Sequence, residues 1–169
     1  MILPLLILNK LGAENVAYYY IAMMIATVLF TIPGATTQSL FAEGSHNEKK
    51  IKEHVKKTVK IIVMLLIPAI LIVVFFGQYI LFLFGKEYAT EGFRFLQIVA
   101  FSGIFVSVNS VFGTLFRIKN RVKEIIIRSI IGAIVILGAS YTFINMGLGL
   151  IGIGYAWIIG QGVVMAFYA

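Results

Sequence analysis

Five long stretches of apolar side chains, each free of acidic residues, divide the chain into regular segments. Each is close to the ~20 residues that a helix needs to cross the hydrocarbon of a bilayer. The short alternating segments of membrane β-strands are absent from the sequence. Since lipid offers no hydrogen-bond partner to backbone groups, the pattern predicts an all-α fold, a polytopic membrane bundle of about five helices. The predicted spans are Val16–Ala42, Ile61–Gly85, Phe95–Phe116, Ile125–Met146 and Ile151–Ala169.

Residues 1–169 together are expected to form a single transmembrane domain, with connecting loops at 43–60 and 117–124. The apolar segment Met1–Leu8 is too short to span a membrane and resembles the end of a helix. At the other end, the last apolar run reaches Ala169 without a polar flank. We therefore expect the chain to be a piece of a longer protein, truncated at both ends.

The composition excludes a soluble domain. Hydrophobic residues make up 60% of the chain and charged residues only 12%, whereas soluble domains carry about 25% charged residues. The net charge of +7 is also found in nucleic-acid-binding proteins, but here the Lys and Arg side chains lie in short patches between apolar runs. We predict membrane lipids as partners and no nucleic acid.

Basic residues are distributed unequally between the two sides of the membrane. If each run crosses once, 43–60 and 117–128 lie on one side with most of the basic side chains, and three remain for the other side. Such an excess marks the cytoplasmic side of a cell membrane. The first group is Lys49, Lys50, Lys52, Lys56, Lys57, Lys60, Arg117, Lys119, Arg121, Lys123 and Arg128, and the second is Lys10, Lys86 and Arg94. The loops 43–60 and 117–124 are therefore predicted to be cytoplasmic.

The first basic loop carries a helical pattern of its own. Ile51, Val55, Val59 and Ile62 recur at helical spacing, which predicts an amphipathic lead-in over Glu48–Lys60 to the second span. Its lysines serve either as a topology determinant that contacts anionic lipid or as a contact for a specific partner or substrate.

The sequence Gly147–Gly152 matches the spelling of a dinucleotide-binding loop, G-x-G-x-x-G. That site needs a preceding strand, a following amphipathic helix and an acidic residue about 20 residues on, and none of these is present. The segment instead predicts a tight external turn that leads into a glycine-rich helix. Gly152, Ala156 and Gly160 then give the small-residue spacing that lets membrane helices approach closely.

No constellation for catalysis or for a cofactor is present. His46 and His54, with nearby Glu43, Glu48 and Glu53, lack the spacing of metal-binding histidines. The chain has neither Asp nor Cys, which excludes a Ser-His-Asp triad and a thiolate site. We predict no enzyme, no metal and no cofactor.

Polar side chains share one face in two of the predicted helices. Such faces turn away from lipid, either toward another helix or toward a water-filled path for a substrate. One face consists of Thr27, Thr31, Gly34 and Gln38, and the other of Gly103, Ser107, Ser110 and Thr114, with Asn109 beside them. Pro33 and Pro68 each remove a backbone hydrogen bond, and kinks of this kind suit a transporter that changes conformation.

Arg128 is the one ionised side chain inside a predicted span, a single turn from its end. Its guanidinium either snorkels to the cytoplasmic surface or contacts the anionic head group of a substrate.

Four segments, in this order, resemble the polysaccharide-exporting flippases. Residues Leu11–Tyr19 resemble the family's "lG-x-e-x-v-g-x-Y" helix start, and Ser39–Gly44 with its basic continuation resembles a helix end and long cytoplasmic loop. Leu83–Tyr88 is similar to the outer loop "l-F-G-x-x-Y", and Gly147–Ala156 to the helix entry "G-l-x-G-a-a-x-A". These flippases form the polysaccharide transporter branch of the multidrug/oligosaccharidyl-lipid/polysaccharide flippase superfamily.

The resemblance implies most of one lobe of a two-lobed flippase, with the second lobe of the same protein as its partner. It also implies movement of a lipid-pyrophosphate-linked oligosaccharide to the outer leaflet. Family members are expected to hold the anionic head group with Arg or Lys in the cavity. The residues taken as candidate substrate contacts are Arg128, Asn109, Ser107, Ser110, Thr114, Gln38 and Thr31.

Two other functions remain open from the sequence. A drug/cation antiporter of the same superfamily usually needs a carboxylate within the membrane, and no Glu lies inside a predicted span. The second alternative is a membrane scaffold or gene remnant that transports nothing.

Overall fold

A computed structural model describes residues 2–46 and 50–168. Over these residues the backbone forms helices and turns and no strand. The five long helices are long and apolar enough to cross a membrane, so the all-α fold class with about five membrane helices is confirmed and the chain is a multi-pass membrane protein. The long helices are α2 (Ala13–His46), α3 (Ile51–Phe82), α5 (Phe93–Ile118), α6 (Val122–Asn145) and α7 (Gly149–Ala166), and the short ones are α1 (Ile2–Leu11) and α4 (Lys86–Glu91).

The helices α2 and α3 extend furthest beyond the apolar runs that predicted them. α2 continues to His46, and α3 begins at Ile51 rather than at Ile61. Charged side chains interrupt the apolar run, but the helix continues through them because Lys and Glu are good helix formers. Most of the predicted loop 43–60 is therefore helical, and the amphipathic lead-in forms the first turns of α3. Its first residues, Glu48 and Lys49, lie outside the described part of the chain.

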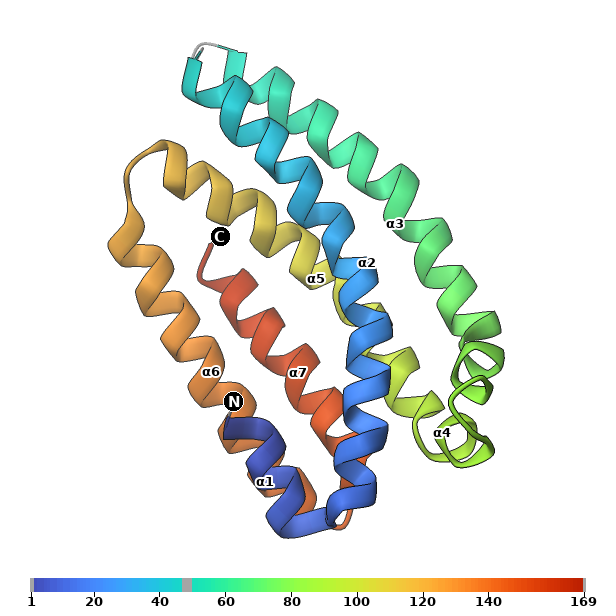
Figure 1. The fold of residues 1–169 in the computed structure, drawn as a ribbon. Helices are drawn as coiled ribbons and strands as arrows, with labels where there is room; N and C mark the ends of the chain where they lie inside the picture. The colour runs from blue at the N-terminus through green and yellow to red at the C-terminus, as the bar shows by residue number, and fades with distance from the viewer. Residues whose placement is uncertain (1, 47–49, 169) are drawn as a thin grey trace.

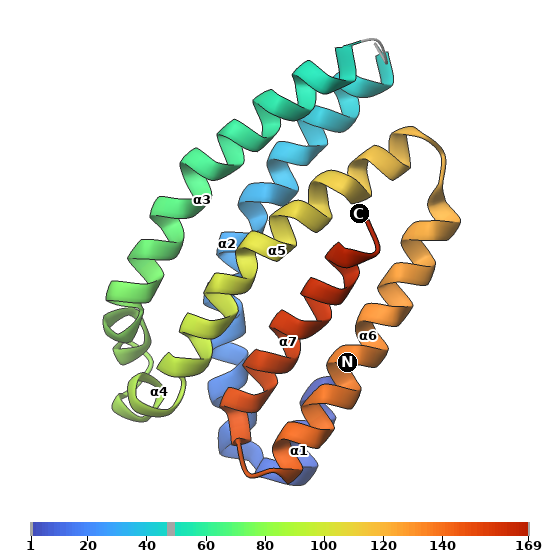
Figure 2. The same cartoon turned by 180° about the vertical axis from the view of Figure 1, so that it is seen from behind.

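The bundle consists of two antiparallel hairpins with α5 between them (Figures 1 and 2). α2 pairs with α3, α6 pairs with α7, and α5 packs against α2, α3 and α7. One end of the bundle holds the tip of the α2–α3 hairpin and the α5–α6 turn, and is called the basic end below. The opposite end holds α4 and the turns that join α1 to α2 and α6 to α7 (Figure 1).

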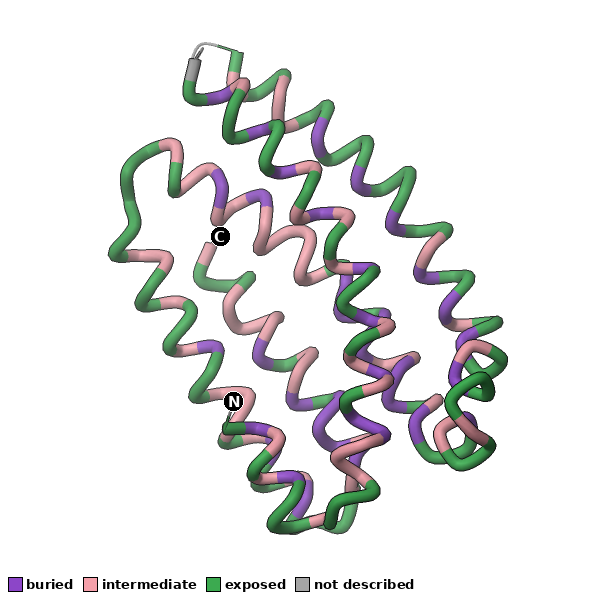
Figure 3. The backbone as a smooth tube through the Cα atoms, in the orientation of Figure 1, coloured by how far each residue is buried: buried purple, intermediate pink, exposed green. Residues whose placement is uncertain are grey.

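Buried and lipid-facing positions separate as expected for a membrane bundle (Figure 3). Leu96 and Val99 of α5 are fully buried beside Ile153 of α7. Phe75 and Tyr79 of α3 are 69% and 72% exposed, because they point away from the other helices. In a membrane, lipid covers such side chains, so their exposure carries no hydrophobic penalty.

The α6–α7 hairpin depends on small residues, as predicted. Gly152, Ala156 and Gly160 are all buried. A Cβ added at Gly152 would lie 2.7 Å from the Cβ of Phe143, and one at Gly160 would collide with Ile136 of α6. The turn between the two helices contains Gly147 at φ +82°, a backbone conformation that favours glycine.

Candidate substrate cavity

A cavity of about 1420 Å³ lies between α1, α2, α5, α6 and α7. α2 and α6 face each other across it with little direct contact. α2 lines the cavity from Tyr19 to Phe41, roughly 33 Å of helix at 1.5 Å per residue. The volume exceeds the ~300–1,000 Å³ of typical small-molecule pockets. The cavity is therefore large enough for a cargo bigger than a drug.

On α5, α6 and α7, the side chains that line the cavity lie mainly toward the basic end. The stretch of α5 that lines it runs from Val106 to Arg117, the part nearest the α5–α6 turn. α6 contributes side chains between Ile125 and Leu137, and α7 between Trp157 and its C-terminal end. The parts of these helices nearest the opposite end, 93–105, 138–145 and 149–156, contribute no side chain to the wall.

At the opposite end, α1 packs against both α2 and α6. The Lys10 ammonium donates to Asn145 Oδ1 at 3.5 Å and lies 5.2 Å from the centroid of the Tyr141 ring. Gly12, at φ +90°, makes the sharp bend that turns α1 back against α2. Helix α1 therefore closes the cavity on this side.

An amide pair from α5 and α7 lies in the cavity wall. The Asn109 amide nitrogen donates to the Gln161 side-chain oxygen at 2.8 Å and to the Gln161 carbonyl at 3.0 Å. Asn109 Oδ1 and Trp157 Nε1 are buried without a hydrogen-bond partner in the described part of the chain. Because both atoms are buried, the wall encloses them and they are not open to the cavity.

Some candidate residues of the two polar faces line the cavity, whereas others hydrogen-bond to the backbone of their own helix. Gln38, Ser110 and Thr114 line the cavity with Asn109. The Thr31 hydroxyl donates to the Val28 carbonyl at 2.6 Å, and neither Thr31 nor Ser107 belongs to the wall. The Ser107 hydroxyl likewise donates to the carbonyl of Ile104, at 2.7 Å.

Arg128 lies behind the cavity wall rather than in it. Its guanidinium carbon is 4.2 Å from the ring centroids of both Phe116 and Tyr168, and the Tyr168 ring lines the cavity. Nη2 lies 3.5 Å from Glu124 Oε2, while Nη1 is buried and has no partner in residues 2–46 and 50–168. The side chain is only 14% exposed. Cation–π contacts and the Glu124 carboxylate hold this side chain among the helix ends at the basic end.

The sequence patterns missed several residues of the cavity wall. Tyr19, Trp157 and Gln161 line it, and Arg117 supplies a cation near the basic end. α7 is apolar on every face, so a single Gln and a single Trp gave no periodic signal there. Arg117 was assigned to the basic loop, because it directly follows the third apolar run.

A metal site has no support from the described residues. They contain no group of three or more side chains suited to hold a metal ion. His54 is paired with Glu43, whereas the side chain of His46 and all of Glu48 lie outside the described part.

Comparison with known proteins identifies a family. The family model described as MatE matches residues 1–144 of the chain. Neither the curated proteins nor the solved structures contain a match. MatE proteins are membrane transporters of the multidrug/oligosaccharidyl-lipid/polysaccharide flippase superfamily and not enzymes, which agrees with the cavity and with the predicted absence of catalysis. Because the match covers most of its length, the chain belongs to the MatE family of multi-pass membrane transporters.

Proposed function

We propose that this chain moves a lipid-linked oligosaccharide across the cytoplasmic membrane for the assembly of a surface polysaccharide. The observation that carries the proposal is the charge of the cavity. Among the described residues that line it, Arg117 is the one charged side chain and none is a carboxylate. A cation at the basic end of a cavity that is otherwise lined by hydroxyl, amide and apolar groups suits an anionic cargo rich in hydroxyl groups.

The sugar part of the cargo matches the middle of the cavity. The Gln38 amide and the Ser110 hydroxyl line the cavity, and each can donate to and accept from a sugar hydroxyl group. Tyr19, Tyr20 and Trp157 add aromatic faces to the wall. Such rings combine an apolar surface with a polar tip and thereby match the C–H face and the hydroxyls of a sugar.

The pyrophosphate part of the cargo matches the basic end. Arg117 lies in the wall, and Arg128 lies directly behind the Tyr168 ring with one N–H group unpaired. Guanidinium groups recognise phosphate oxygens through two parallel hydrogen bonds. In this proposal, Tyr168 moves aside and Arg128 joins Arg117 on the head group.

The rest of the proposal concerns assembly and orientation. The chain acts as one transmembrane domain and pairs with a second lobe of the same protein, which completes the cavity between α2 and α6. Segments 43–60 and 117–124 face the cytoplasm, so the cavity receives its cargo from the inner leaflet.

Drug/cation antiport is the second candidate, because the MatE family is compatible with both functions. It requires a carboxylate in the cavity for the coupling cation, and that carboxylate would have to come from another lobe.

Reconstitution into proteoliposomes separates the two functions. We expect protein-dependent movement of a fluorescent lipid-linked oligosaccharide and no proton- or sodium-driven efflux of a cationic dye. Dye efflux without lipid movement would favour the antiporter.

Asn109→Leu should lower transport about fivefold to tenfold, since it removes the buried hydrogen bonds that hold the Gln161 side chain in the cavity wall. The initial rate of oligosaccharide-lipid movement in proteoliposomes measures the change. Ser107→Ala is the matched control on α5, because the Ser107 hydroxyl bonds its own helix, and its rate should stay within about twofold. Equal losses in both variants would contradict the assigned role of Asn109.

Single-cysteine labelling tests the orientation, since the chain contains no natural cysteine. Ser110→Cys lies in the cavity, and Met146→Cys is a control at the opposite end, where Met146 is 73% exposed. A membrane-impermeant maleimide should label Ser110→Cys in inside-out vesicles and Met146→Cys in intact cells. The reverse result would invert the proposed orientation.

A further inference from the structure

A second, smaller hollow lies between α2 and α3 near the basic end. Its volume is about 360 Å³. α2 lines it from Ala35 to Glu43, and α3 contributes Lys57, Thr58 and Ile61. Ala35 and Ser39 are one helical turn apart, and their small side chains leave the gap between the two helices. Neither residue belongs to the wall of the main cavity.

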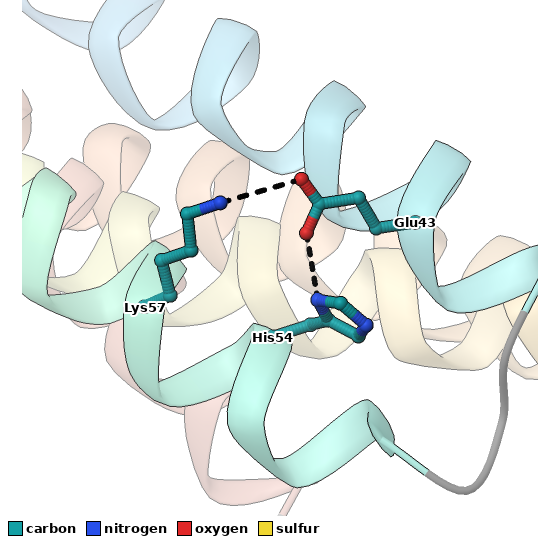
Figure 4. Close-up of polar contacts among 3 residues, drawn as sticks. All are labelled: Glu43, His54 and Lys57. Carbon is teal, nitrogen blue, oxygen red and sulfur yellow. Dashed lines mark hydrogen bonds and ion pairs between the residues drawn. The ribbon is translucent and has the colours of Figure 1, made fainter.

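The polar groups of this crevice suit a phosphate. Ser39 and Thr58 supply hydroxyl groups and Lys57 supplies an ammonium group, whereas the Thr36 hydroxyl donates to the Ile32 carbonyl of its own helix at 2.7 Å. The carboxylate of Glu43 is already engaged on both of its oxygens (Figure 4). His54 Nδ1 lies 2.6 Å from Oε2 and Lys57 Nζ lies 3.5 Å from Oε1. Because the Lys57 ammonium offsets its charge, Glu43 does not leave the crevice with a net negative charge.

The crevice also lies at the depth of the lipid head groups. The charge-free part of α3 begins at Ile61 and continues to the end of the helix at Phe82, roughly 33 Å of helix. This length matches the ~30 Å hydrocarbon core of a bilayer. Ile61 therefore lies at the edge of the hydrocarbon, and Lys57, one turn further, lies level with the phosphates.

We infer that this crevice binds the phosphate head group of an anionic phospholipid from the surrounding leaflet. Lys57 and the hydroxyl groups hold the phosphate. The acyl chains run along the face of α3 that continues from Lys57 through Ile61 to Leu65. Ile61 is 38% exposed and Leu65 is 52% exposed. The bound lipid stabilises the α2–α3 hairpin at a site separate from the transport cavity.

Native mass spectrometry of the purified chain in an uncharged detergent tests this site, because a micelle removes the diffuse field of an anionic membrane. Titration with phosphatidylglycerol should show one saturable bound lipid, and phosphatidylcholine should bind about tenfold more weakly. Lys57→Gln should weaken phosphatidylglycerol binding about tenfold. Lys56→Gln is the matched control on the next residue, an exposed lysine outside the crevice, and should change binding less than about twofold.

Ser39→Leu gives an independent check, because it fills the crevice and keeps every charge. It should abolish the saturable lipid. Equal losses in Lys56→Gln and Lys57→Gln, or full binding in Ser39→Leu, would overturn the site. Inorganic phosphate at ten times the lipid concentration should displace little lipid; complete displacement would assign the crevice to free phosphate and overturn the lipid as its ligand.

Discussion

Gly160→Ala is expected to destabilise the bundle more than any other single methyl addition to a glycine of α7. The added Cβ would collide with Ile136 of α6 and would lie 3.4 Å from the Gly132 carbonyl oxygen. Since both neighbours belong to a closely packed helix, α6 and α7 must separate. Overpacking of this kind costs about 1–3 kcal/mol. Thermal unfolding in detergent, followed by tryptophan fluorescence, measures the loss of stability. The single tryptophan, Trp157, lies about one turn from the substitution.

Two further variants make this prediction specific. Gly162→Ala introduces the same methyl group into the same helix, but its nearest neighbour is Phe105 Cε1 at 3.9 Å, an ordinary contact. Its free energy of unfolding should stay within about 1 kcal/mol of the parent, or rise slightly through helix propensity. Ile136→Ala removes the colliding atoms, so the double variant should be at least about 1 kcal/mol more stable than the sum of the two single changes. Strict additivity would show that the α6–α7 contact is not the cause.

The fold was largely predictable because lipid imposes a simple rule. Each span needs ~20 apolar residues and must satisfy its backbone internally, so the apolar runs located all five long helices. The helix ends were less predictable. Hydropathy registers the boundary of the lipid at Lys60, whereas the helix continues through charged residues to Ile51, because backbone hydrogen bonding does not depend on side-chain charge.

The cavity was predictable only in part. Helical spacing placed Gln38, Ser110 and Thr114 on faces that do line it. The same spacing included Thr31 and Ser107, which lie outside the wall. A polar face extends along the helix, whereas the cavity wall includes only some of the residues on that face. Trp157 and Gln161 gave no signal, since their helix shows no polar face against which they stand out. Their place depends on how α7 packs against α5, which sequence periodicity does not encode.

Arg128→Gln is expected to lower transport of the oligosaccharide-lipid at least about thirtyfold. A buried charge that loses its partner typically costs 2–5 kcal/mol, and ~2 kcal/mol corresponds to about thirtyfold. The unpaired Nη1 and the two aromatic rings show a guanidinium that is positioned but not fully bonded. Arg128→Lys should recover only part of the rate, because an ammonium group keeps the charge but loses the planar stacking and the paired donors. The apparent KM and the maximal rate in proteoliposomes measure both variants.

A purely structural role for Arg128 makes a different prediction. Phe116→Leu removes one stacking ring and keeps the charge, so it should lower the unfolding temperature about as much as Arg128→Gln but reduce transport far less. Lys123→Gln is the control for charge alone, because Lys123 is exposed on the same helix and near the same end. If Phe116→Leu and Arg128→Gln lose stability and transport in parallel, Arg128 holds the helix ends together, and Arg117 binds the phosphate of the head group. If only Arg128→Gln raises KM, its guanidinium reaches the head group, and the Tyr168 ring between it and the cavity must move during transport.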